Sequence, residues 1–148
     1  MKTSAPGNVL ISFLVGLGII ALISAVSIPY IKQYQPNLKL NANAKIITTD
    51  LRHAQQLTIT EQITHKVVFF TDSDTYSIVK DTEPAEIIKT VNLDSEITFQ
   101  TITGFTNDEV VFNYYGGVSQ SGQIILININ SKTKTINVKP SGYVQLTQ

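Results

Sequence analysis

The apolar run from Asn8 to Ile31 constrains this chain more than any other stretch. Its 24 residues contain no charged side chain, and at about 1.5 Å of rise per residue a helix of this length crosses a hydrocarbon core of roughly 30 Å. We therefore predict a transmembrane helix over residues 8–31. The run exceeds the roughly 7 to 15 residues of a signal-peptide core, which favours a retained anchor over a cleaved secretory signal.

Small and hydroxylated residues recur along this run: Gly16, Gly18, Ala21, Ser24, Ala25 and Ser27. Such residues let helix backbones approach closely within lipid. Two interpretations stay open, an ordinary single anchor and a helix that packs against other helices. Pro29 does not separate them, because prolines near the ends of membrane helices are tolerated. Lys2 on one side of the run and Lys32 and Lys39 on the other leave the topology open as well.

A helical pattern continues beyond the apolar run. Apolar residues recur there at steps of three and four, at Leu40, Ala44, Ile47, Leu51 and Ala54. This spacing predicts an amphipathic helix over residues 32–62 that lies with one face against a sheet. We expect a bend at or just before Pro36, because proline removes a backbone donor and crowds the preceding turn.

From residue 63 to residue 148 the apolar period changes from 3.6 to 2, which is typical of strands. Seven or eight short strands are expected, over residues 65–70, 76–78, 87–93, 97–99, 110–115, 123–130, 135–138 and 143–146. Apolar residues of both parities at 67–70 predict a strand covered on both sides, and those at 124–127 predict a central strand. Ile87, Val91 and Leu93 share one parity and predict a half-buried strand. One long helix followed by strands alone predicts an α+β fold with an antiparallel sheet.

Composition and motifs argue against a catalytic or metal-binding site. Eleven basic and eleven acidic residues balance, and cysteine is absent, so thiolate metal sites and a cysteine nucleophile are excluded. His53 and His65 lack a metal-ligand spacing and are expected at the surface or at the edge of the core. Asp72 and Asp74 lie in an acidic stretch that lacks the glycine and the distal glutamate of a calcium loop. We predict a non-enzyme without a cofactor or a metal.

An apolar N-terminal rod that continues into an amphipathic helix and then a β-rich head resembles the type IV pilin and pseudopilin superfamily. The resemblance rests on a short basic N-terminal segment that ends in Gly7, the apolar run from Asn8, and Ile28-Pro29. Within the superfamily the head looks most like the GspH/FimT group of minor pseudopilins and minor pilins. Segments that carry this likeness are 50–54, 67–70, 110–117, 123–129, 136–138 and 141–144.

The resemblance implies a processing site and a set of partners. A prepilin peptidase would cut between Gly7 and Asn8, remove residues 1–7 as a leader and methylate the new amino terminus. The chain would sit in the bacterial inner membrane as a single-pass protein with an extracytoplasmic head. It would then enter a pseudopilus or pilus through contacts with other pilins and an inner-membrane assembly platform.

Two residues depart from the family pattern. Asn8 stands where phenylalanine usually follows the cut, and Ser12 stands where the fifth mature residue is usually glutamate. A serine cannot form the ion pair that a carboxylate makes with a neighbouring terminal amine. Two interpretations of Ser12 stay open, a subunit at the filament tip and a divergent subunit that enters filaments weakly.

Three classes of function follow. The leading hypothesis is a structural subunit of a type II secretion pseudopilus or a type IV pilus. The alternative is a FimT-like minor pilin that binds DNA, for which Lys132, Lys134 and Lys139 are the candidate contacts, although three lysines predict only a weak nucleic-acid footprint. The third class, a membrane-anchored enzyme, has no residues that locate an active site.

Overall fold

The computed structural model describes residues 6–147, with side chains from Val9 onward. It divides between Gln35 and Pro36 into two compact units, which are described separately below. Most of the predicted leader, residues 1–5, lies outside the described residues, and so do the side chains of Gly7 and Asn8 at the predicted cleavage site.

One helix, α1 (Pro6–Glu61), runs through both units and continues without interruption past Pro29 and Pro36. The bend predicted near Pro36 falls at the boundary between the units and stays a prediction. The helix ends where Gln62 turns to a φ of 56°, and the Gln62 backbone N–H donates to Thr58 O at 3.0 Å. A residue in this left-handed conformation is a common way to terminate a helix.

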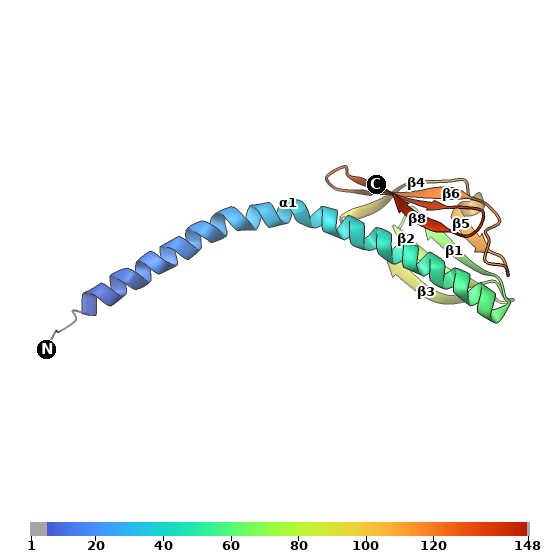
Figure 1. Cartoon of the computed structure of the whole chain (residues 1–148), viewed down its shortest axis with the longest axis horizontal. Helices are drawn as coiled ribbons and strands as arrows, with labels where there is room; N and C mark the ends of the chain where they lie inside the picture. Colours follow the sequence, from blue (N-terminus) through green and yellow to red (C-terminus); the bar gives the residue numbers. More distant parts are fainter. Residues whose placement is uncertain (1–5, 148) are drawn as a thin grey trace. The chain divides into compact units, whose positions relative to one another are not determined.

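The second unit carries eight strands in two antiparallel sheets, with the last turns of α1 beside them (Figure 1). The first sheet has the order β3-β2-β1-β5. Its strands are β1 (His65–Phe70), β2 (Thr75–Lys80), β3 (Glu86–Asn92) and β5 (Glu109–Phe112). Val67 lies opposite Ile78 on one side and Val110 on the other, so that apolar residues of three strands share one face.

The second sheet has the order β4-β6-β7-β8. Its strands are β4 (Ile97–Thr103), β6 (Gly122–Asn128), β7 (Thr133–Val138) and β8 (Val144–Thr147), and the short 3-10 helix η1 (Thr106–Asp108) precedes β5. Ile124 lies opposite Ile136, and Val138 lies opposite Val144. Because side chains alternate along a strand, these pairs put one apolar row of each strand on the same side of the sheet.

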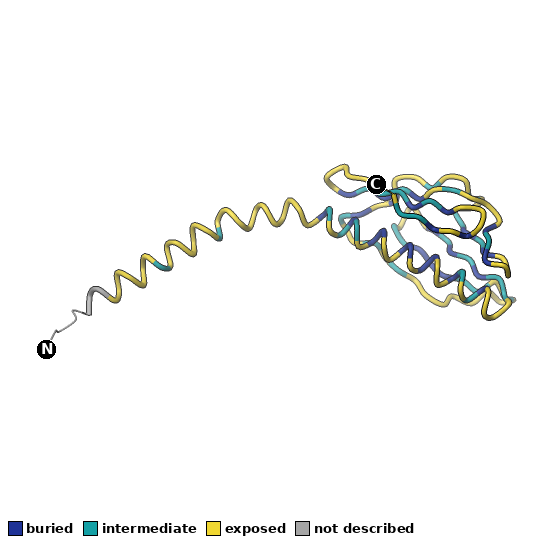
Figure 2. Tube along the Cα trace, viewed as in Figure 1, coloured by how far each residue is buried: buried dark blue, intermediate teal, exposed yellow. Residues whose placement is uncertain are grey.

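A single hydrophobic core joins α1 to both sheets. The predicted helical stripe is confirmed, because Leu40, Ala44, Ile47, Leu51 and Ala54 are each at most 2 % exposed. Figure 2 shows the alternation of buried and exposed positions along this part of α1. The α+β class, with a long helix packed on antiparallel strands, is likewise confirmed.

Several predictions about the strands are wrong. The head holds two sheets instead of one. β1 is covered on one side only, since Val67 and Phe69 are buried while Phe70 is 48 % exposed. The prediction of a central strand at β6 is confirmed, because β6 is paired on both edges, and it buries alternate residues. β3 is exposed along nearly its whole length because it is an edge strand without a layer over either face.

Candidate assembly surfaces

The first half of α1 presents apolar side chains that nothing in the described chain covers. Val9, Leu14, Leu22 and Val26 are between 68 and 75 % exposed. The helix is long and apolar enough to cross a membrane, and no residue in its most apolar stretch is buried. Soluble proteins rarely leave an apolar surface of this extent in water. This half of α1 therefore needs a cover of lipid or of other helices.

The small residues of this half leave room for a close neighbour. A side chain added at Gly16 or Gly18 would meet nothing within 4 Å. Ser12 lies on the same apolar segment and is exposed. Pro29 lies within α1 near the end of the apolar run.

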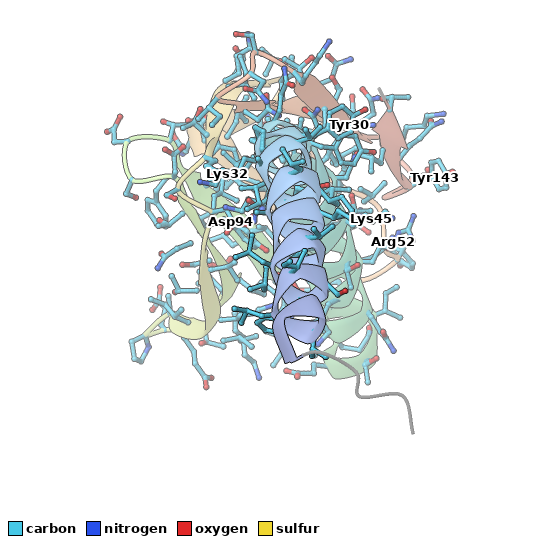
Figure 3. All side chains as sticks on the ribbon, turned by 90° about the vertical axis from the view of Figure 1, so that its left-hand side faces the viewer. Tyr30, Lys32, Lys45, Arg52, Asp94 and Tyr143 are labelled. Carbon is cyan, nitrogen blue, oxygen red and sulfur yellow. The ribbon has the colours of Figure 1, made fainter. Side chains whose placement is uncertain are left out.

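The second half of α1 is tied to the strands by polar contacts on its flanks. Asn43 donates to Asp94 Oδ2 at 2.7 Å. Arg52 Nη2 donates to Val144 O at 3.0 Å, on the opposite flank. Figure 3 shows the two flanks, with Asp94 on one side of α1 and Lys45, Arg52 and Tyr143 on the other. These contacts fix the rotation of the helix about its own axis in a way that an apolar stripe alone does not.

A buried polar cluster lies between the flanks. Asp50 is 5 % exposed, accepts from the Tyr76 hydroxyl at 2.6 Å, and accepts from Lys89 Nζ at 2.8 Å with both carboxylate oxygens. Burial, together with the hydrogen bond to Asp50, raises the pKa of Tyr76 well above its ordinary value. The cluster joins α1 to β2 and β3 through one carboxylate.

A second polar cluster closes the end of α1. Lys80 donates to Glu61 Oε2 at 2.6 Å, which holds the pKa of Glu61 below its ordinary value and raises the pKa of Lys80. His65 is fully buried, and its Nδ1 lies 2.8 Å from Ile63 O. His65 is therefore a core residue of β1, which corrects the prediction of a surface or core-edge histidine.

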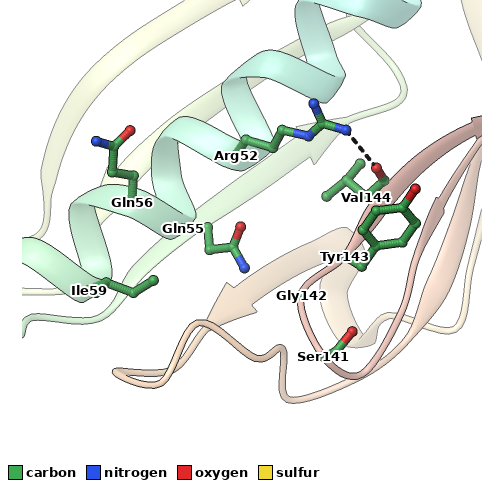
Figure 4. Close-up of a pocket in the computed structure, with 8 residues that line it drawn as sticks. All are labelled: Arg52, Gln55, Gln56, Ile59, Ser141, Gly142, Tyr143 and Val144. Carbon is green, nitrogen blue, oxygen red and sulfur yellow. Dashed lines mark hydrogen bonds between the residues drawn. The ribbon is translucent and has the colours of Figure 1, made fainter.

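A groove of about 510 Å³ lies between α1 and the turn before β8 (Figure 4). Arg52 and Gln55 line it from the helix, and Tyr143 lines it from the turn. Gln55 Nε2 donates to Gly116 O at 2.6 Å. Gly142 has a φ of +77°, and a side chain at this position would collide with Gly116 O. The two turns thus approach each other backbone to backbone, and the Gln55 side chain ties them to α1.

Solved structures of other proteins share this architecture. The minor pseudopilin EpsH from the type 2 secretion system of Vibrio cholerae matches with a TM-score of 0.65 at 10 % identity, over 74 % of this chain and 96 % of that chain. The type IV minor pilin FimU of Pseudomonas aeruginosa matches with a TM-score of 0.63 at 11 % identity, over 81 % of this chain and 93 % of that chain. The chain has a type IV pilin-like fold. No family model and no curated protein sequence matches it.

The pilin-like head separates the three lysines that were predicted as DNA contacts. Lys132 and Lys134, at the start of β7, line a hollow together with Asn37 and Asn41 of α1. Lys139 follows the other end of β7, and its Nζ lies 5.5 Å from the ring centre of Tyr143. At about 3.3 Å per residue the two sites are roughly 20 Å apart.

The acidic stretch of the pilin-like head does not converge on one point. Asp74 Oδ1 accepts from the Phe99 backbone N–H at 2.9 Å, and Asp81 faces Lys66 at 3.9 Å. Among the described residues no group of three histidine, cysteine or acidic side chains is placed to hold a metal ion.

Sequence reasoning missed the buried polar residues of the pilin-like head. Asn43 and Asp50 lie outside the apolar stripe of the amphipathic helix, yet both are 5 % exposed. Their partners, Asp94 and Tyr76, lie 51 and 26 residues further along the chain. A polar residue next to the apolar stripe was the only local signal.

Proposed function

We propose that this chain is a minor pilin or pseudopilin-like structural subunit of the GspH/FimT type. It is stored in the inner membrane through the first half of α1 as a single-pass protein with an extracytoplasmic head. After a prepilin peptidase cleaves between Gly7 and Asn8, the same helix packs with the helices of other subunits in a type II secretion pseudopilus or a type IV pilus. The role is structural and not enzymatic.

The main support for this proposal is the exposed apolar surface of the first half of α1. The head has a hydrophobic core of its own and does not cover that surface. Burial of one large aliphatic or aromatic side chain is worth about 1.5–3 kcal/mol. The apolar half carries more than a dozen such side chains, all at least half exposed. Lipid can cover them in the stored state and sister helices can cover them in a filament, so one surface serves both states. The fold shared with EpsH and FimU supports the same interpretation.

Ser12 bears on the position of the subunit in a filament. A serine hydroxyl cannot neutralise the terminal amine of a neighbouring subunit, whereas a carboxylate can. A subunit at the tip, with no preceding subunit to neutralise, has no need of that carboxylate, and a divergent subunit that enters filaments weakly could also do without it.

Intact mass of the membrane-extracted protein, with and without the peptidase, tests the proposal. The expected mass lacks residues 1–7 and carries one added methyl group when the peptidase is present. An uncut chain in cells that hold an active peptidase would reduce the apolar half to an ordinary anchor.

DNA binding is the second candidate, because Lys45 and Arg52 of α1 lie on the same flank as Tyr143 and so extend the basic character of Lys139 (Figure 3). The prediction is a salt-dependent retardation of duplex DNA by the protein, with contacts at Lys132, Lys134 and Lys139. Absence of binding at low salt would remove this candidate.

A further inference from the structure

The balanced net charge of the chain hides a strong segregation of charge. Residues 63–109 hold nine acidic and three basic side chains, whereas residues 110–148 hold three lysines and no acidic side chain. The first segment forms β1 to β4 and ends at Glu109, the first residue of β5; the second forms the rest of β5 together with β6, β7 and β8. Fields of opposite sign on two parts of one surface steer association between molecules.

The cations form what we call the basic strip, along the flank of α1 that faces β7 and β8. It consists of Lys45, Arg52, Lys132, Lys134 and Lys139. Arg52 reaches the backbone of β8, and Lys139 lies over Tyr143, which is 54 % exposed. No carboxylate in the described part of the chain lies within ion-pair distance of these five side chains.

The carboxylates form what we call the acidic edge, around β3. It consists of Asp81, Glu83, Glu86 and Asp94, all of them exposed. β3 is the outer strand of its sheet, and it exposes Ile87 by 65 % and Ile88 by 40 %. Of the nearby cations, Lys89 is held by Asp50, and Lys66 lies closer to Glu109, at 3.1 Å, than to Asp81, at 3.9 Å. The acidic edge thus combines negative charge, the unpaired outer edge of a strand and apolar side chains, which together favour a protein partner.

The basic strip and the acidic edge lie on opposite flanks of the second half of α1. Figure 3 separates Asp94 on one side from Lys45, Arg52 and Tyr143 on the other. Each flank also has its charges at two levels along the helix. On the basic flank Lys132 and Lys134 lie beside Asn37 and Asn41, and Lys139 lies with Tyr143 at the groove further along α1.

The carboxylates of the acidic flank also lie at two levels along α1. Asp94 contacts Asn43, and Asp81 follows Lys80, which contacts Glu61 near the end of α1. At 1.5 Å per residue the two levels are separated by roughly 20–30 Å on each flank. Two heads placed side by side with parallel helices would therefore bring both levels into register at once.

We propose that the basic strip of one subunit docks against the acidic edge of a second copy of this chain. The contact is heterologous, because each subunit uses a different face, and such contacts propagate along a filament instead of closing a dimer. It sets the second halves of the two helices parallel to each other. The inference rests on the proposed structural role and adds the faces through which neighbouring heads meet.

A charge swap tests the docking in full-length protein in membranes. One variant carries Lys134→Glu and Lys139→Glu, and the other carries Glu83→Lys and Glu86→Lys. Each variant alone opposes like charges, so we expect the yield of crosslinked dimer to fall about tenfold. In a mixture, both contacts between unlike variants join opposite charges, so the yield of mixed dimer should recover. Variants that keep the charge, Lys134→Arg with Lys139→Arg and Glu83→Asp with Glu86→Asp, serve as matched controls and should crosslink as the parent chain does.

The absence of native cysteine allows a geometric test in the same membranes. A chain with Glu83→Cys and a differently tagged chain with Lys139→Cys should form a disulfide when they are produced together. Chains that all carry the same single cysteine should not. Disulfides only between identical positions would overturn the heterologous arrangement.

Two further outcomes would overturn the proposal. One is a mixture of charge-swapped variants that fails to recover. The other is that the protein retards duplex DNA, and that Lys134→Glu with Lys139→Glu abolishes the retardation but leaves the yield of crosslinked dimer unchanged. The basic strip would then bind nucleic acid and not a second copy of the chain. Crosslinks placed along residues 9–29 report separately on the helix, so failure of the head contact is distinguishable from failure of the proposed structural role.

Discussion

Replacing Asp50 by alanine should destabilise the head more than any other single polar change along α1. Asp50 accepts from Tyr76, whose side chain is fully buried, and from Lys89 at 2.8 Å. The change leaves the Tyr76 hydroxyl without its acceptor inside the core.

The magnitude follows from the contacts. Breaking a buried ion pair costs about 3–5 kcal/mol, and the Lys89 side chain is 44 % exposed, so we expect about 3 kcal/mol for Asp50→Ala. Tyr76→Phe removes one hydrogen bond to a charged group without leaving a void and should cost about 1.5–2 kcal/mol. The double variant should cost at least about 1 kcal/mol less than the sum, because both changes remove the same bond.

Urea unfolding of the full chain in detergent micelles, followed by near-ultraviolet circular dichroism of the tyrosines, measures these free energies. Lys45→Ala on the exposed face of the same helix is the control and should change the free energy of unfolding by less than about 0.5 kcal/mol. A cost below about 1 kcal/mol for Asp50→Ala, or strict additivity with Tyr76→Phe, would refute the assigned role of the buried cluster.

The remaining predictions concern other parts of the chain. The hydrogen bond from Lys80 holds the pKa of Glu61 below its ordinary 4.5, so the pair stabilises the fold above about pH 4.5, and this stabilisation is lost as the pH falls through the folded pKa. When the free energy of unfolding is measured against pH, Glu61→Gln should lose less stability below about pH 4.5 than the parent chain does. The same loss in both chains would contradict this. Gly142→Ala places a side chain against Gly116 O at positive φ and should cost about 1–3 kcal/mol in thermal unfolding, whereas a neutral effect would show that the two turns can separate. Ser12→Glu should change the amount of subunit recovered in sheared filaments, and an equal recovery would make this position irrelevant to assembly.

The parts of the fold set by local patterns were predictable from the sequence. The stripe from Leu40 to Ala54 is buried as its spacing predicts, because one face of a helix has only one core to meet. Alternation at Ile136 and Val138 likewise predicts the buried row of β7.

The parts set by the neighbours of each strand were not predictable. Ile87 belongs to an alternating pattern yet is 65 % exposed, because β3 is an edge strand with no layer to cover it. Phe70 ends an apolar run yet lies at the end of a hairpin, where the second face is open. The buried role of Asp50 depends on Tyr76 and Lys89, which only the folded chain brings to it.

The basic strip shows the same division. Lys132, Lys134 and Lys139 stand out in a sequence segment without acidic residues. Lys45 and Arg52 join them only because α1 packs beside β8. Grouping cations from distant parts of a chain requires the topology, which the strand pattern alone leaves open.

The central claim is that the apolar half of α1 exchanges lipid for the helices of other pilin-type subunits. Photo-crosslinkers placed singly at positions 9–29 of the full chain, in cells that assemble the apparatus, test this most directly. We predict adducts with pilin-type proteins on one face of the helix, in a pattern that repeats every three to four residues. Adducts with lipid alone at every position, in cells with assembled filaments, would contradict the claim.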